Sequence, residues 1–210
     1  MKYLDFYNKL DTMEKQDYIE NYLLYSTSLV IAEVKPAVTI AIKKTSTRLY
    51  NTWNDFGKAF VDNIGLKFVE LRENNDCIIV MIYNEKLLYK EINKKSHTNF
   101  LAKLGYPSLV NVTDYVNVLK SRYEKYHCPH ELGLFLGIPF EDVKDFMECT
   151  TKKCLLCGYW KVFNNEEKAK ITFERFDTIK EYTMKNILKG NSSYDLALSI
   201  KSFYKYKFIS

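Results

Sequence analysis

The sequence predicts an α+β fold, with a small, mostly antiparallel sheet of about four strands packed with helices in a single domain. Hydrophobic residues make up 47% of the 210 residues, which is enough to fill a sizeable core. Strand-like apolar segments are few, and they mix with amphipathic segments without the strict alternation of a parallel α/β sheet. Only 7 Gly and 4 Pro are present, so a loop-rich or disordered chain is disfavoured.

The first half of the chain supplies most of the strands. Residues 37–42 are apolar and β-branched and follow Pro36, which is typical of a strand entry. Residues 66–73 and 77–83 indicate a hairpin around the polar turn 74–76. The segment 77–83 is apolar at nearly every position, so we expect it to be the central and most buried strand, covered on both faces.

Helices are predicted before, between and after these strands. The N-terminal residues and residues 46–64 carry apolar side chains at helical spacing, and Gly65 stands where a helix-ending glycine belongs. Thr113 can cap a later helix, and Asn165 precedes a long helix with two glutamates in its first turn. Further helical segments are expected at residues 96–104, 113–126, 130–136 and 140–148, and a short strand at 159–163.

The domain organisation is simple. We expect residues 1–190 to form one α+β domain and residues 191–210 a C-terminal helical appendage after a break at Gly190. No apolar stretch approaches the roughly 20 residues that a membrane-spanning helix needs. No apolar run follows the first two residues, so a secretory leader is not expected. These features predict a protein without a membrane partner.

The charge is only mildly positive. The 31 Lys and Arg residues exceed the 26 Asp and Glu residues to give a net charge of +5. The densest basic stretches are the pairs Lys43-Lys44 and Lys94-Lys95, whereas nucleic-acid binding needs positive charge concentrated on one face. We therefore expect no nucleic-acid partner.

Residues 131–146 nevertheless have the rhythm of a helix–turn–helix motif, in which the second helix enters the major groove of DNA. Phosphates would repel that second helix because its acidic residues outnumber its one basic residue. The charges concerned are Glu141, Asp142, Asp145 and Glu148 against Lys144. The shape fits DNA binding, and the charge does not.

His130 and Glu131 are the candidate catalytic residues. Pro129 suits the first turn of a helix, which would place the His-Glu pair near free backbone N–H groups that favour anions. A neutral His beside a carboxylate can act as a general base. The alternative is a Glu that complements the helix dipole and a His that caps a loop. Position 134 is Leu, so the two-histidine zinc-protease motif is absent.

Two lysines lie at element boundaries and complete a predicted ligand site. Lys35 precedes Pro36, and strand alternation would place Tyr159 and Lys161 on one face, with Trp160 on the other. A strand lysine either protects a sheet edge or binds an anion in a cleft. We expect one shared concavity, with a small anionic ligand bound by Lys35, His130, Glu131, Tyr159 and Lys161.

The cysteines offer an alternative site. Five Cys residues, an odd number, argue against a disulfide framework. Cys154 and Cys157 have the spacing of a zinc knuckle or of a redox pair, although Leu-Leu between them suits a buried segment. A zinc site would also need Cys128 and Cys149 or a nearby His. We expect ordinary free thiols, with no metal and no cofactor.

Three functional classes therefore stay open: a module that binds a small anion, an enzyme with His130 as acid/base and Glu131 orienting it, and a protein whose Tyr-rich surface docks a protein partner. The chain holds 17 Tyr, and tyrosine serves cores and interfaces equally well. No phosphate loop, dinucleotide fingerprint or nucleophile elbow is present, so the common nucleotide and acyl-transfer enzymes are disfavoured.

Three segments of the chain resemble a family of small proteins from clostridia and related anaerobic Firmicutes that is known only as a domain of unknown function. The segments are Ile-Ala-Glu-Val-Lys-Pro at 31–36, Pro-His-Glu-Leu-Gly-Leu-Phe-Leu-Gly at 129–137 with the acidic residues that follow, and Gly-Tyr-Trp-Lys-Val-Phe at 158–163. The family usually has a Cys-x-Pro-Thr run before Lys-Pro, and this chain departs from that run. The resemblance implies a cytoplasmic protein and implies no particular reaction.

Overall fold

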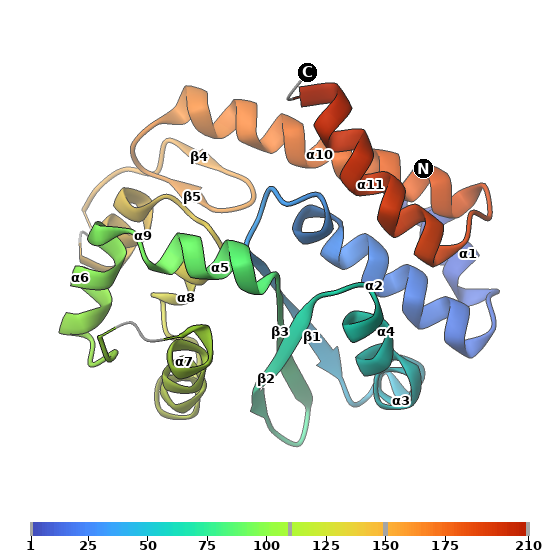
Figure 1. Cartoon of the computed structure of the whole chain (residues 1–210), viewed down its shortest axis with the longest axis horizontal. Helices are drawn as coiled ribbons and strands as arrows, with labels where there is room; N and C mark the ends of the chain where they lie inside the picture. The colour runs from blue at the N-terminus through green and yellow to red at the C-terminus, as the bar shows by residue number, and fades with distance from the viewer. Residues whose placement is uncertain (1, 109–110, 149–150, 209–210) are drawn as a thin grey trace.

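Three antiparallel strands, in the order β1–β3–β2, form the centre of the fold in this computed structural model, which describes residues 2–108, 111–148 and 151–208 (Figure 1). The strands are β1 (Ala37–Lys43), β2 (Lys67–Glu73) and β3 (Cys77–Tyr83). Tyr83 of β3 lies opposite Ala37 on one side and opposite Lys67 on the other. A separate two-stranded hairpin consists of β4 (Leu156–Cys157) and β5 (Lys161–Val162). The predicted α+β class is confirmed.

Strand β3 is the most buried strand, as predicted. Five of its seven residues are buried and the other two are half-buried. Val80 and Ile82 belong to the core on one face of the sheet, while Met81 and Tyr83 belong to the core on the other face. Successive side chains of a strand point to opposite faces, so a strand covered on both faces must be apolar at every position.

The N-terminal and C-terminal helices together cover one face of the sheet (Figure 1). They are α1 (Lys2–Asp11), α2 (Lys15–Ile31), α3 (Thr47–Thr52), α4 (Lys58–Asn63), α10 (Glu166–Leu188) and α11 (Ser193–Phe208), with a π-helical turn at Trp53–Gly57. Asn165 caps α10 as predicted, with its side chain accepting from the N–H of Lys168 at 2.9 Å. Helix α11, in the segment expected to be an appendage, packs on α2 and α10 and buries Leu196 and Ile200 in this core.

Five helices from the middle of the chain cover the other face (Figure 1). They are α5 (Glu85–Ile92), α6 (Lys95–Lys103), α7 (Val112–Tyr126), α8 (Leu132–Phe135) and α9 (Phe140–Glu148). Helix α7 begins earlier than predicted: the side chain of Asn111, not of Thr113, caps it by accepting from the N–H of Asp114 at 2.9 Å. Within the described residues, no helix is both long and apolar enough to cross a bilayer.

Two glycines permit close contacts that place α8, α9 and the β4–β5 hairpin. Gly137 has φ +73°, and a Cβ there would lie 2.6 Å from Cδ of Pro36. A Cβ on Gly158 would lie 2.4 Å from the ring of Phe173 on α10. Only a glycine tolerates both the left-handed backbone and the approach to Pro36 without strain. The turn after α8 therefore rests on the loop before β1, and the hairpin rests on α10.

Candidate functional site

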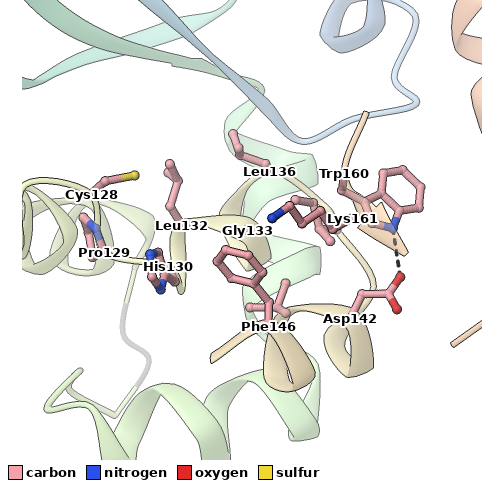
Figure 2. A pocket seen from close by; sticks show the side chains of 12 residues that line it. Cys128, Pro129, His130, Leu132, Gly133, Leu136, Asp142, Phe146, Trp160 and Lys161 are labelled. Carbon is pink, nitrogen blue, oxygen red and sulfur yellow. Dashed lines mark hydrogen bonds between the residues drawn. The ribbon is translucent and has the colours of Figure 1, made fainter. Parts of the chain in front are cut away.

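A cavity of about 380 Å³ lies between the segment 128–138, helix α9 and the β4–β5 hairpin (Figure 2). Its walls are largely apolar. The apolar side chains that line it include Leu132, Leu136, Ile138, Val143, Phe146 and Trp160. A cavity of this size and character is typical of small-molecule sites, in which a few polar groups fix the orientation of the ligand.

Phe146 stands between the two basic side chains of this cavity. The ring centroids of His130 and Phe146 are 4.9 Å apart in an edge-on arrangement, and Nζ of Lys161 is 5.5 Å from the centroid of Phe146. Phe146 is 43% exposed, which is unusual for a large apolar side chain and places it at the mouth of the cavity. Figure 2 shows the Lys161 amine directed from the hairpin toward Phe146 and His130.

In the part of the chain that the structure describes, neither of these two side chains has an acidic partner. Among the described residues, no carboxylate lies within ion-pair distance of Lys161, and no side-chain hydrogen bond involves the imidazole of His130. The attraction of an ammonium to an aromatic face is smaller than that of a desolvated ion pair. Lys161 therefore offers an unpaired positive charge beside an apolar cavity.

Asp142 holds the hairpin against α9 at the edge of the cavity. This carboxylate is only 3% exposed, and its Oδ2 accepts from Nε1 of Trp160 at 2.8 Å (Figure 2). Its Oδ1 accepts from the backbone N–H groups of Phe163 and Asn164 at 2.9 and 3.1 Å and from the Asn164 amide at 2.9 Å. With four donors already bound, Asp142 fixes the orientation of Trp160 and is not free to bind a ligand.

Glu131 faces away from the cavity. It is 1% exposed and pairs with Arg122 of α7, while the hydroxyl of Tyr106 donates to it at 3.2 Å. Burial, followed by the negative charge of Glu131, raises the pKa of Tyr106. The adjacent His130 is exposed at the cavity, so the predicted pairing of Glu131 with His130 is not formed. Glu131 belongs to an ion pair that joins α7 to the turn before α8, with its carboxylate buried and the Arg122 guanidinium half-buried.

The backbone N–H groups at the start of α8 are also occupied. The N–H groups of Leu132, Gly133 and Leu134 donate to the carbonyl groups of the residues three positions earlier, at 2.9–3.1 Å. Helix α8 spans only four residues, Leu132–Phe135. The anion-binding helix N-terminus that the sequence suggested is therefore replaced by a tight turn with no free amide in these positions.

Lys35 and Tyr159 lie in a different place, under helix α10. The hydroxyl of Tyr159 donates to Oδ1 of Asp177 at 2.8 Å, and Nζ of Lys35 is 5.9 Å from the ring centroid of Phe176. Neither residue lines the cavity of His130 and Lys161. The five predicted ligand residues therefore do not share one concavity. His130 and Lys161 line the cavity, Glu131 pairs with Arg122, and Lys35 and Tyr159 lie beside α10.

Lys180 of α10 lies near Lys35 in this region, a proximity that no pattern in the sequence predicts. Both amines are half-buried, and Nζ of Lys180 lies 4.3 Å from the ring centroid of Tyr25. Burial lowers the pKa of each lysine to about 8, and for Lys35 the positive charge of Lys180 adds to this effect. No carboxylate among the described residues lies within ion-pair distance of either amine.

The sequence also assigned Trp160 to the face opposite Lys161, and the structure differs. Strand β5 begins only at Lys161, because residues 158–160 form a turn in which the N–H of Gly158 donates to the carbonyl of Trp160 at 3.1 Å. Both Trp160 and Lys161 line the cavity as a result. Trp160 is thus a site residue that strand periodicity did not identify. Phe146 and Asp142 of α9 are two further site residues that the sequence analysis did not single out.

The cysteines do not gather into one group. The sulfurs of Cys154 and Cys157 lie 3.3 Å apart, whereas the Cys128 sulfur lies 3.8 Å from the hydroxyl of Tyr123. Cys149 falls outside the described residues. Among the residues that are described, no three His, Cys, Asp or Glu side chains are placed to hold a metal ion together.

Comparison with known proteins gives one match. A family described as "Protein of unknown function (DUF3793)" matches residues 23–197. This range includes all three segments on which the resemblance to a family of unknown function was based. Searches of the curated proteins and of the solved structures find no matching protein.

Proposed function

The chain belongs to this family of proteins of unknown function, and we propose that it binds a small molecule with an apolar body and an anionic group in the cavity beside Lys161. The apolar walls would bury the body of the ligand. Lys161 would pair with its carboxylate or phosphate, and the His130 imidazole would contribute a hydrogen bond.

The single observation that carries this proposal is the unpaired amine of Lys161 beside apolar walls. A lysine without an acidic partner is ordinary on an open surface, where water solvates it. Lys161 is exposed too, but its side chain lines a cavity of about 380 Å³, and the one acidic side chain that lines the same cavity, Asp142, is fully hydrogen-bonded. A ligand anion would find a cation whose charge no described carboxylate offsets.

The geometry favours binding over catalysis. An acid/base role for His130 needs a partner that fixes the tautomer of the imidazole, and the adjacent carboxylate of Glu131 is bound to Arg122 instead. The proposed ligand site contains fewer polar residues than the sequence predicted. Of the five predicted residues it includes His130 and Lys161, and it leaves out Lys35, Glu131 and Tyr159.

A thermal-shift screen with matched acids and amides tests the proposal. Suitable pairs are 3-phenylpropionate with 3-phenylpropionamide and octanoate with octanamide, with inorganic phosphate as an anion that lacks an apolar body. A bound acid at one hundred times its Kd stabilises the fold by about 2.7 kcal/mol. We expect the acids to raise the Tm and to quench Trp160 fluorescence, and the amides and phosphate to do neither. Equal shifts with acid and amide, or no shift with any acid, would overturn the proposal.

A further inference from the structure

Cys154 and Cys157 stand at the start of the β4–β5 hairpin with their sulfur atoms in contact. The Sγ atoms are 3.3 Å apart, and Sγ of Cys154 also lies 3.3 Å from the carbonyl oxygen of Leu156. A disulfide bond needs about 2.05 Å between the sulfurs, so they have only about 1.3 Å left to close. Small side-chain rotations can supply a movement of that size.

The two thiols differ in their access to solvent. Cys157 is exposed and Cys154 is half-buried. The intervening Leu155 is 45% exposed, so the Leu-Leu spacer is not the buried segment that the sequence suggested. A reagent can therefore reach Cys157 directly, whereas Cys154 is positioned to attack the Cys157 sulfur once that sulfur is part of a mixed disulfide.

Lys161 lies opposite Cys157 across the hairpin. Cys157 and Lys161 are partners in the register of β4 and β5. The hydrogen bond with Cys154 raises the pKa of Cys157, and the Lys161 cation opposes that rise. The reduced pair is therefore held as two thiols joined by a hydrogen bond, and the Lys161 cation only limits the rise in the pKa of Cys157.

We propose that Cys154 and Cys157 form a reversible thiol–disulfide site that exchanges with low-molecular-weight disulfides. In the first step the Cys157 thiolate attacks the disulfide, which forms a mixed disulfide and releases one thiolate that takes up the proton from Cys157. In the second step Cys154 attacks the sulfur of Cys157, which forms the intramolecular bond and releases the second thiol. One external disulfide is thus reduced to two thiols while the dithiol is oxidised, and the reverse reaction uses the same steps.

Lys161 neighbours both this pair and the proposed ligand site. The thiol–disulfide proposal nevertheless rests on the contact of the two sulfurs and their access to solvent, and its test needs no ligand in the cavity. Two cysteines also fall short of the four ligands of a structural zinc site, and no third donor joins them among the described residues.

The test uses the purified full chain in buffers of fixed ratios of reduced to oxidised glutathione, which serves as the probe disulfide. Free thiols are then blocked by alkylation, and the products are identified by intact mass and peptide mapping. We expect a loss of two hydrogens per chain that maps to Cys154 and Cys157 and reverses when the ratio is reversed. Alkylation of both thiols at every ratio, or a disulfide that instead includes Cys128 or Cys149, would overturn the proposal.

Two single variants separate the roles of the sulfurs. Cys154→Ser is expected to accumulate the mixed disulfide with glutathione on Cys157, because no resolving thiol is left. Cys157→Ser is expected to accumulate several-fold less, because Cys154 is half-buried. Cys128→Ser, which removes an exposed thiol at the cavity, serves as the matched control and should still form the 154–157 bond. Equal mixed disulfide in the first two variants would contradict the assignment of Cys157 as the attacking thiol.

Discussion

The Trp160 indole N–H donates to Oδ2 of Asp142 at 2.8 Å, and this bond joins the β4–β5 hairpin to α9 at the edge of the cavity. The other oxygen of the same carboxylate binds the backbone at Phe163 and Asn164, so one buried side chain sets both the tilt of Trp160 and the path of the strand that carries Lys161. The position of the proposed cation thus depends on a residue that does not itself bind the ligand.

Replacement of Asp142 should destabilise the fold. Asp142→Ala leaves the indole and two backbone N–H groups without their acceptor, and we expect a loss of about 3 kcal/mol in the free energy of unfolding. Urea unfolding followed by tryptophan fluorescence measures this. Asp145→Ala, one helical turn along α9, is the control and should have a clearly smaller effect, because its half-buried carboxylate accepts from the side chains of Lys152 and Asn164 and not from the buried backbone N–H of Phe163. Similar losses for both variants would argue against the role given to Asp142.

His130 and Glu131 are neighbours in the sequence, yet replacing them should affect the free energy of unfolding to very different extents. Glu131→Gln breaks the ion pair of the buried carboxylate with Arg122 and should cost about 3 kcal/mol of stability. His130→Ala removes an exposed side chain and should change stability by less than about 0.5 kcal/mol. Chemical denaturation of the two variants beside the unchanged protein provides the comparison. A stable Glu131→Gln variant with altered ligand binding would return Glu131 to the cavity.

The half-buried lysines under α10 should make stability depend on pH. Lys35 has a pKa of about 8 in the fold against 10.5 in the unfolded chain, so the unfolded chain holds the extra proton between these values. Stability from this group therefore rises as the pH increases from 8 to 10.5, and below pH 8 the charged amine costs about 3 kcal/mol. Lys35→Met should accordingly be more stable than the unchanged protein at pH 7.

The measurement is the difference in unfolding free energy between Lys35→Met and the unchanged protein, taken at pH 7 and again near pH 10. We expect the difference to shrink across this window, because the native amine is already neutral at the higher pH. Lys67→Met, at a side chain that is 59% exposed, is the control and should show no such trend. A constant difference for Lys35→Met would mean that its amine is not held in an environment that disfavours charge.

Much of the fold could be predicted because short, local sequence patterns specify many of its helices and strands. Alternate side chains of β3 enter the cores on the two faces of the sheet, so both sets must be apolar. The nearly continuous apolar run at 77–83 shows this requirement directly in the sequence. Asn165 as the N-cap and the two glutamates that follow it mark the start of α10 in the sequence. Such signals involve neighbouring residues only, so a single sequence contains them in full.

The site was less predictable, because it depends on where short irregular segments point. His130 and Glu131 diverge in the turn just before the four-residue helix α8, where helical periodicity assigns no face. Trp160 reaches the cavity because a turn at 158–160 replaces the first part of the strand that was expected at 159–163. The approach of Lys180 to Lys35 brings together residues that are far apart in the chain, and no local pattern records it.

The proposed function depends most on whether Lys161 recognises a ligand anion. Isothermal titration of the best acid from the screen, and of its amide, should be carried out on the unchanged protein, on Lys161→Met and on the control Lys67→Met. We predict that Lys161→Met weakens binding of the acid at least about tenfold, or about 1.4 kcal/mol, that Lys67→Met does not, and that the amide binds detectably to none of the three proteins. Equal affinity of the unchanged protein and Lys161→Met for the acid would contradict the account.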